Sequence, residues 1–284
     1  MPHPQPSSSV VYLIGNARKP GAAETFHRLS DWLQTKGVLG GADLDGRPEL
    51  INDAKPDFII ALGGDGTILS VGQAMAHRQV PIIGVNLGKL GYLADFSVEE
   101  LEHYLDRILS DPSLVSMRMM LDVRVIDPAG EAWSGIALND CVIRVGQPFR
   151  TISLAVHFNN QPVTTIVGDG LIIATPTGST AHNMSCGGPI VEPDISAILM
   201  TPKCPHSLSH RPVVVGSDAQ VSVTIDKTSE GAAVVLDGQS VHTVTGGTEI
   251  CLSKSKEMFQ LVRHPHRESW DTLTMKLKWG QNLT

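Results

Sequence analysis

The sequence predicts two domains, an N-terminal α/β domain built on a parallel sheet and a C-terminal domain of mostly antiparallel strands. The chain has 284 residues, of which 42% are hydrophobic, and this length suits about two domains of ~100 to 200 residues each. Near residue 118 the hydrophobic pattern changes from alternating strands and helices to consecutive strands. We therefore expect one domain at 1–118, rejoined by 262–284, and a second at 119–261.

The first domain is predicted from short apolar runs that alternate with amphipathic segments. Strands are expected at 10–15, 57–62 and 80–85, and helices at 22–36, 67–76 and 98–109. Such alternation is typical of a Rossmann-like domain, in which helices cover a parallel sheet. Phosphate-binding loops of these sheets lie at the carboxyl ends of strands, where residues 63–67 and 86–91 both fall.

The second domain is predicted from β-branched and alternating runs that are separated by turn sequences. Strands are expected at 121–126, 152–156, 221–225 and 233–236, with turns at 127–130, 159–160, 237–238 and 246–247. The last segment, 268–279, regains a helical pattern. We expect this helix to return to the first domain and pack there.

Composition excludes several classes of function. The net charge is −7, from 22 basic and 29 acidic residues, and aromatic residues make up only 5%. The surface therefore offers no general attraction to nucleic acid or to an anionic membrane, and few platforms for stacking bases. No apolar run approaches the ~20 residues that span a bilayer, and the first nine residues lack a signal pattern. We expect a cytoplasmic protein with neither nucleic acid nor membrane as a partner.

The four cysteines carry no sign of a disulfide framework or a zinc site. They are scattered without paired spacing, at Cys141, Cys186, Cys204 and Cys251. We expect reduced thiols and no firm metal site held by the protein itself.

A glycine-rich turn follows the predicted strand at 57–62 and reads Gly63-Gly64-Asp65-Gly66-Thr67. The three glycines can take positive φ and let backbone N–H groups approach a phosphate, while Thr67 can cap the next helix. A carboxylate among phosphates is expected to bind a metal or to accept a proton from the attacking hydroxyl, as in phosphoryl transfer. An ordinary strand-to-helix turn can carry the same five residues.

A longer run at 168–189 holds a second acidic glycine turn and a turn rich in hydroxyl groups. Thr177, Ser179 and Thr180 supply hydroxyls and backbone donors that suit phosphate or ribose. Ser179 or Thr180 could also begin a short helix at Ala181, whose positive end would face a ligand. Helix capping alone is the alternative explanation of these hydroxyl residues.

In order and spacing, several segments resemble the NAD kinase family: 63–67, 86–93, 139–140, 169–189, 199–211 and 237–239. The first turn is shared with diacylglycerol and sphingosine kinases, whereas 175–181 together with 201–212 is more specific. The resemblance spans nearly the whole chain. It implies Mg²⁺-dependent transfer of the γ-phosphoryl group of ATP to the 2′-hydroxyl of the adenosine ribose of NAD, giving NADP and ADP.

The resemblance also implies roles for single residues. Asp65 would be the catalytic base, in a turn where Gly63, Gly64, Gly66 and Thr67 bind phosphate, and Mg²⁺ would be held mainly by ATP. The NAD-binding positions would be Asn139, Asp140, Arg150, Asp169, Thr177, Ser179, Thr180, Ala181, His182, Ser185 and Gln239. A simple turn role for Gln239 and an exposed Arg150 without a ligand stay open as alternatives.

Three positions depart from the family pattern. His182 stands where members usually carry Tyr, and it presents a smaller ring that can become charged near neutral pH. Asp140 replaces the usual Glu, and Val167 stands where many members have Arg or Lys. We expect these changes to affect affinity and the preference between NAD and NADH more than the reaction.

Two alternatives remain at this stage, a lipid kinase of the diacylglycerol or sphingosine type and a dinucleotide sensor that has lost turnover. The negative charge opposes the first, because a lipid kinase needs a membrane-facing patch. The retained Asp65 opposes the second. Sheet edges in the β domain, and a possible contact of Arg150 across an interface, lead us to expect a homodimer or homotetramer.

Overall fold

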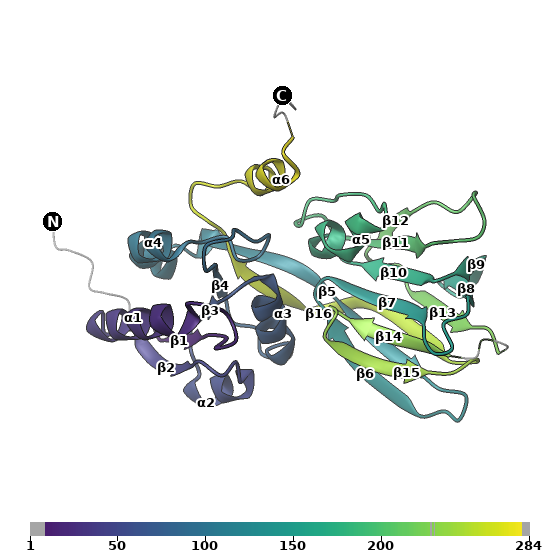
Figure 1. Cartoon of the computed structure of the whole chain (residues 1–284), viewed down its shortest axis with the longest axis horizontal. Coiled ribbons are helices and arrows are strands. Elements are labelled where there is room, and N and C mark those ends of the chain that lie inside the picture. The colour runs from purple at the N-terminus through teal and green to yellow at the C-terminus, as the bar shows by residue number, and fades with distance from the viewer. Residues whose placement is uncertain (1–8, 228, 230, 280–284) are drawn as a thin grey trace. The chain divides into compact units, whose positions relative to one another are not determined.

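The computed structural model describes residues 9–227, 229 and 231–279 (Figure 1). The chain divides into two compact units, Met1–Met117 with Phe259–Thr284 and Arg118–Met258. Each unit has its own hydrophobic core. The long strands β5 (Val115–Ile126) and β16 (Glu249–Val262) run along the chain from one unit into the other.

The first unit is built on a parallel sheet, as predicted. Its strands are β1 (Val11–Ile14), β2 (Leu39–Asp43), β3 (Phe58–Leu62) and β4 (Ile82–Val85), joined by the end of β16, in the order β2-β1-β3-β4-β16. The helices are α1 (Ala22–Thr35), α2 (Ile51–Ala54), α3 (Asp65–Ala74), α4 (Val98–Ser110) and α6 (Ser269–Leu277), with short 3₁₀ turns at Pro48–Leu50 and Pro112–Leu114. Apolar faces of α1 and α4 pack with the sheet residues into one core.

The edge strand β2 was not predicted, because its sequence, Leu-Gly-Gly-Ala-Asp, lacks an apolar run. Its glycines are required by space. A Cβ atom on Gly40 would lie 2.2 Å from the Val10 side chain, and one on Gly41 would lie 2.7 Å from the Tyr12 ring. The side chains of Val10 and Tyr12 therefore occupy the space that side chains at Gly40 and Gly41 would take.

Two details of the glycine turn differ from the prediction. Helix α3 begins at Asp65 rather than Thr67, and its N-cap is Gly64 without a side-chain cap, so the capping role of Thr67 was wrong. None of the three glycines has a positive φ. Gly63 is needed for space instead, because a Cβ there would lie 2.3 Å from the Thr67 hydroxyl oxygen.

The second unit consists mainly of antiparallel strands, which confirms the predicted β domain. One sheet has the order β12-β11-β10-β7-β14-β15, and the other pairs β16-β13-β8-β9, with β5 and β6 as a hairpin. The remaining strands are β6 (Ala132–Ala137), β7 (Asp140–Val145), β8 (Ile152–Phe158), β9 (Gln161–Gly168), β10 (Gly170–Ala174), β11 (Ala197–Lys203), β12 (Val213–Gly216), β13 (Val221–Ile225), β14 (Ala232–Leu236) and β15 (Ser240–Val244). Residues of both sheets share one core.

Two short helical segments follow β10, a 3₁₀ turn at Thr177–Thr180 and α5 (His182–Ser185). The N-cap of α5 is Ala181, which makes no side-chain cap. The prediction that Ser179 or Thr180 caps a helix here was therefore wrong.

The C-terminal helix α6 belongs to the first unit, as predicted. The hydroxyl of Thr272 donates to the Asp95 carboxylate at 3.4 Å. Within the described part of the chain, no helix is both long and apolar enough to cross a bilayer.

Candidate active site

The carboxylate of Asp65 is held by three consecutive backbone amides. Its Oδ1 accepts hydrogen bonds from the N–H groups of Leu93 and Ala94, and its Oδ2 accepts one from Tyr92, each at 3.0 Å. A carboxylate has about four acceptor positions. The amides occupy both positions of Oδ1, so the position left for a further donor lies on Oδ2.

Glycine lets the loop come this close to the carboxylate. A Cβ atom on Gly91 would lie 2.0 Å from Asp65 Oδ1, and one on Gly84 would lie 2.3 Å from the Leu93 carbonyl oxygen. Both distances are far below van der Waals contact, so a side chain at either position would force the backbone apart. The motif at 86–93 thus has a physical role, because it supplies amides that hold the carboxylate of the Gly63 turn.

Asn86 fixes the base of the same loop. Its buried side-chain amide donates to the Phe96 carbonyl at 2.8 Å and to the Ala94 carbonyl at 3.4 Å, and its Oδ1 accepts from the Gly88 amide at 3.0 Å. The loop that supplies the three amides is therefore tied down at both of its ends.

Lys19 was missed by the sequence analysis. A Cβ atom on Gly64 would lie 3.0 Å from the Lys19 ammonium nitrogen, so this cation lies beside the glycine turn. The signal was present, because Lys19 follows strand β1 at the carboxyl end of the sheet, where anions bind in such folds.

The second unit contains a cavity of about 370 Å³. It is lined by Asn139, Asp140, Val142, Arg144, Ala181, His182, Val235, Asp237, Gly238 and Val241. The cavity thus brings together four residues of the predicted NAD site, Asn139, Asp140, Ala181 and His182. The other predicted positions do not line it: Arg150, Asp169, Thr177, Ser179, Thr180, Ser185 and Gln239.

Asp237 holds the segment that carries Asn139 and Asp140. Its Oδ1 accepts from the amides of Asn139 at 2.7 Å and Asp140 at 3.0 Å, and its Oδ2 accepts from Leu138 at 2.9 Å. Sequence reasoning placed Asp237 in a turn and in one of the segments that resemble the family, but gave it no role of its own. Its role was hidden because its partners lie almost a hundred positions away in the chain.

Asp140 is buried and faces another acid. Burial raises the pKa of Asp140 to about 7, and the charge of Asp237 adds to the rise. Near neutral pH its carboxyl group therefore exists in both protonation states, and the neutral form can donate a hydrogen bond as well as accept one.

Asn139 is packed against the glycine-rich run. The Thr175 amide donates to its carbonyl oxygen at 2.8 Å, and a Cβ atom on Gly178 would lie 2.0 Å from the same oxygen. The buried Oδ1 of Asn139 and the hydroxyl oxygen of Thr177 lack hydrogen-bond partners in the described structure. Buried polar atoms of this kind are uncommon and mark a place where a ligand or water can bond.

Several predicted residues have other surroundings. The Ser179 hydroxyl is fully buried, donating to the Val191 carbonyl at 3.0 Å and accepting from its amide at 3.1 Å. Asp169 joins β9 to β10, Ser185 ends α5, and Gln239 lies in the turn between β14 and β15. Arg150 is exposed in the loop between β7 and β8. A role for these residues in binding NAD stays a prediction.

The sequence analysis expected the His182 ring to become charged near neutral pH, but its surroundings favour the neutral form. Burial lowers the pKa of its imidazole, and the nearby cations Lys203 and Arg144 lower it further. The ring is therefore mainly neutral at pH 7 rather than poised to become charged. Arg144, which the sequence analysis did not single out, supplies a positive charge to the cavity wall instead.

No group of three or more His, Cys, Asp or Glu side chains is placed to hold a metal ion in the described ranges, 9–227, 229 and 231–279.

Comparison with known proteins gives two family matches. Residues 46–112 match the ATP-NAD kinase N-terminal domain, and residues 138–264 match the ATP-NAD kinase C-terminal domain. A protein named NAD kinase from Heliobacterium modesticaldum is 36% identical over 280 residues, 95% of this chain and 99% of that protein. Another from Geotalea daltonii is 40% identical over 225 residues, 79% of each chain.

Solved structures show the same fold. Yeast NADH kinase complexed with NADH matches with a TM-score of 0.88 at 22% identity, over 97% of this chain and 89% of that one. An NAD kinase from Archaeoglobus fulgidus in complex with ATP matches with a TM-score of 0.78 at 27% identity, over 95% and 99%.

Replacing Asp237 by Asn should destabilise the protein. One of the two acceptor oxygens becomes an NH₂ group that faces backbone donors, so at least one buried N–H loses its partner at a cost of about 1–3 kcal/mol. Urea unfolding measures this cost, with the exposed Asp218→Asn as the matched control in the same unit. A loss no greater than that of the control would refute the role given to Asp237.

Asp140 should make stability depend on pH in a defined direction. Between about pH 4 and pH 7 the folded state keeps a proton that an unfolded Asp, of pKa ~3.9, has released, so stability falls as pH rises through this window. The unfolding free energy of the native chain minus that of Asp140→Asn, measured from pH 4 to 9, should decrease up to about pH 7 and then level off. A difference independent of pH would contradict the buried, protonated state.

Proposed function

The chain belongs to the ATP-NAD kinase family, and we propose that it transfers the γ-phosphoryl group of ATP to the 2′-hydroxyl of the adenosine ribose of NAD, with Asp65 as the catalytic base. The observation that carries this proposal is the Asp65 carboxylate, which three amides orient while one acceptor position on Oδ2 stays available. The products are NADP and ADP.

The proposed step moves one proton and one phosphoryl group. The ribose 2′-hydroxyl is a poor nucleophile until its proton is accepted, and Asp65 Oδ2 has the acceptor position for it. The 2′-oxygen forms its bond to the γ-phosphorus while the bond to the bridging oxygen breaks, and ADP leaves with that electron pair. The amides of Tyr92, Leu93 and Ala94 keep the carboxylate in place during this transfer.

Phosphate binding is assigned to the turn before α3. The N-terminus of this helix presents backbone N–H groups and a partial positive charge to an anion. Gly66 leaves the approach open, since a Cβ there would meet nothing within 4 Å. Lys19 beside Gly64 adds a full positive charge that suits a triphosphate.

Dinucleotide binding is assigned to the cavity of the second unit. Asn139 and Asp140 offer amide and carboxyl groups that suit ribose hydroxyls or an adenine edge, and Asp237 holds both in place. Arg144 on the same wall suits a pyrophosphate. NAD-binding roles stay predictions for the other positions: Arg150, Asp169, Thr177, Ser179, Thr180, Ser185 and Gln239.

A divalent metal ion, Mg²⁺, fits this site as a companion of ATP rather than as a resident of the protein. The described residues offer no cluster of metal-ligating side chains, and Mg²⁺ commonly keeps waters and substrate phosphates as ligands. When bound, the ion would neutralise charge on the β- and γ-phosphates.

The lipid-kinase alternative is not favoured. It shares only the Gly63 turn, whereas the family matches extend over both units. A homodimer or homotetramer and a cytoplasmic location stay predictions of the sequence analysis.

The test is NADP formation from NAD, ATP and Mg²⁺ by the purified chain. Asp65→Asn should lower kcat ~100-fold or more, the scale of losing a general base, and should leave NAD binding largely intact. Asp106→Asn is the matched control, because Asp106 is an exposed acid of the same unit paired only with Lys36 in the described contacts. No NADP from the native chain, with NAD still bound, would instead favour a dinucleotide sensor.

A further inference from the structure

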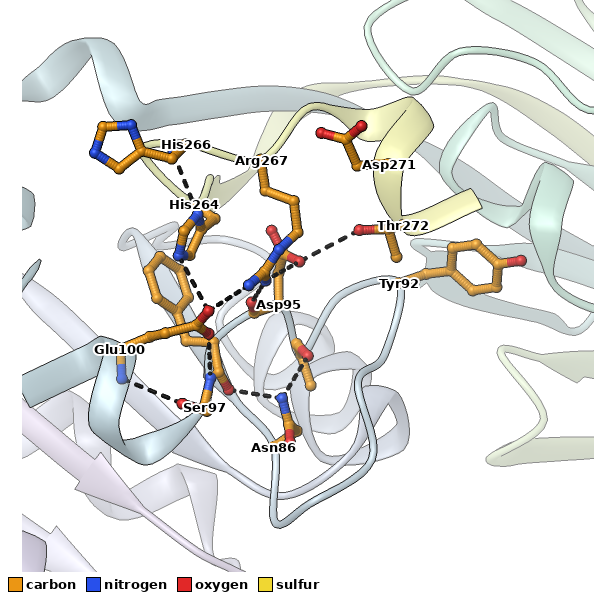
Figure 2. Close-up of polar contacts among 12 residues, drawn as sticks. Asn86, Tyr92, Asp95, Ser97, Glu100, His264, His266, Arg267, Asp271 and Thr272 are labelled. Atoms are coloured by element: carbon orange, nitrogen blue, oxygen red, sulfur yellow. Dashed lines mark hydrogen bonds and ion pairs between the residues drawn. The ribbon is translucent and has the colours of Figure 1, made fainter. Parts of the chain in front are cut away.

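We propose that Arg267 is a positioning residue for Asp65, acting through the loop that donates the three amides. The inference rests on the proposed function, because it gives Asp65 a catalytic role. All residues involved belong to the first unit. Figure 2 shows Arg267 at the centre of the network that links the C-terminal segment to this loop.

Arg267 lies between β16 and α6, and its side chain is 16% exposed. Its NH1 nitrogen donates to the Asp95 backbone carbonyl and, at 2.9 Å, to Asp95 Oδ1. Its NH2 nitrogen donates to Glu100 Oε1. The Arg267 guanidinium therefore hydrogen-bonds both the backbone and the side chain of Asp95.

Asp95 directly follows the amides that hold Asp65. Ala94, its neighbour, donates its N–H to Asp65 Oδ1 at 3.0 Å, and the Ala94 carbonyl accepts from the Gly91 amide at 3.0 Å. The Cα atoms of Ala94 and Asp95 belong to one planar, rigid peptide unit, so a displacement of the Asp95 Cα atom is carried into the Ala94 backbone. Arg267 therefore contacts the residue that directly follows the three amides that orient the proposed base.

Glu100, the second acid that Arg267 contacts, is itself held at the start of α4. Its Oε2 accepts from the Ser97 amide at 2.8 Å, and the Ser97 hydroxyl accepts from the Glu100 amide at 3.2 Å, which forms a capping box at the start of α4. His264 Nε2 lies 3.5 Å from Glu100 Oε1. Arg267 therefore ties the loop to a capped, rigid helix end.

The same C-terminal segment contacts the loop at two further points. The buried Thr272 hydroxyl donates to Asp95 Oδ1 at 3.4 Å (Figure 2). The Lys276 ammonium lies 4.5 Å from the centre of the Tyr92 ring, within cation–π range. The C-terminal segment therefore contacts both ends of residues 92–95, the stretch that contains the three donor amides.

Removing Arg267 would leave buried negative charge behind. Burial raises the pKa of Asp95, and Arg267 is the main influence in the opposite direction. An acid that loses its buried partner is strongly disfavoured unless it moves to water or takes up a proton. Movement of Asp95 toward water displaces the backbone beside it, which includes the amides that hold Asp65.

The experiment compares Arg267→Met with Arg47→Met. Arg47 makes a similar pair with the buried Asp43 in the same unit, with its Nε at 3.0 Å and its NH2 at 2.6 Å from Oδ1. Arg267→Met should lower kcat for NADP formation ~10- to 100-fold, the scale of a misplaced catalytic group, while KM for NAD and ATP changes less than about threefold. Arg47→Met should leave kcat near its native value even if it costs similar stability.

A readout without substrate separates this inference from the proposed function. The backbone amide resonances of Tyr92, Leu93 and Ala94 should shift in Arg267→Met, because their hydrogen bonds to Asp65 lengthen, and should stay in place in Arg47→Met. If the native chain makes no NADP but these amides still shift, the positioning contact stands and the proposed function falls.

Unchanged amide resonances and an unchanged kcat in Arg267→Met would overturn the inference, as would an equal loss of kcat in Arg47→Met. Should Arg267→Met fail to fold, Thr272→Val removes one hydrogen bond to Asp95 at nearly constant volume. It should shift the same amides in the same direction by a smaller amount, and no shift would again refute the proposal.

Discussion

A carboxylate held by three consecutive backbone amides is the interaction on which both units depend. Asp65 is held by residues 92–94 and Asp237 by residues 138–140. In each case the acid and the segment are distant in sequence, so the bonds fix a loop that local propensity alone would leave mobile. In the first unit the acid is the proposed reactive group. In the second unit the acid is the support, and the segment that it holds carries the groups proposed to bind the ligand.

Close approach to an oxygen atom explains why glycine occurs at two positions of the candidate site. Gly91 leaves room for Asp65 Oδ1, and Gly178 leaves room for the Asn139 carbonyl. Neither has a positive φ, so space rather than backbone conformation selects glycine there. At Gly91 the missing side chain lets three amides reach the Asp65 carboxylate, and at Gly178 it lets the glycine-rich run pack against the Asn139 backbone.

The sequence predicted the fold class and the first and third strands well, because their apolar runs are buried in the parallel sheet. It missed β2, where two glycines replace the apolar residues of an ordinary strand. It singled out Asp65 from local pattern, and Asn139 and Asp140, which line the cavity, through resemblance. Asp237 and Arg267 escaped, because their partners lie 98 and 172 positions away, and no local pattern reveals bonds over such distances.

An experimental structure of the chain with NAD bound tests most directly whether Asp65 acts as the base. We expect the ribose 2′-oxygen within about 2.6–3.2 Å of Asp65 Oδ2, the range for proton transfer to a base. We also expect the amides of Tyr92, Leu93 and Ala94 to remain on the carboxylate. A 2′-oxygen that contacts neither Asp65 oxygen, or a carboxylate released from these amides, would contradict this role.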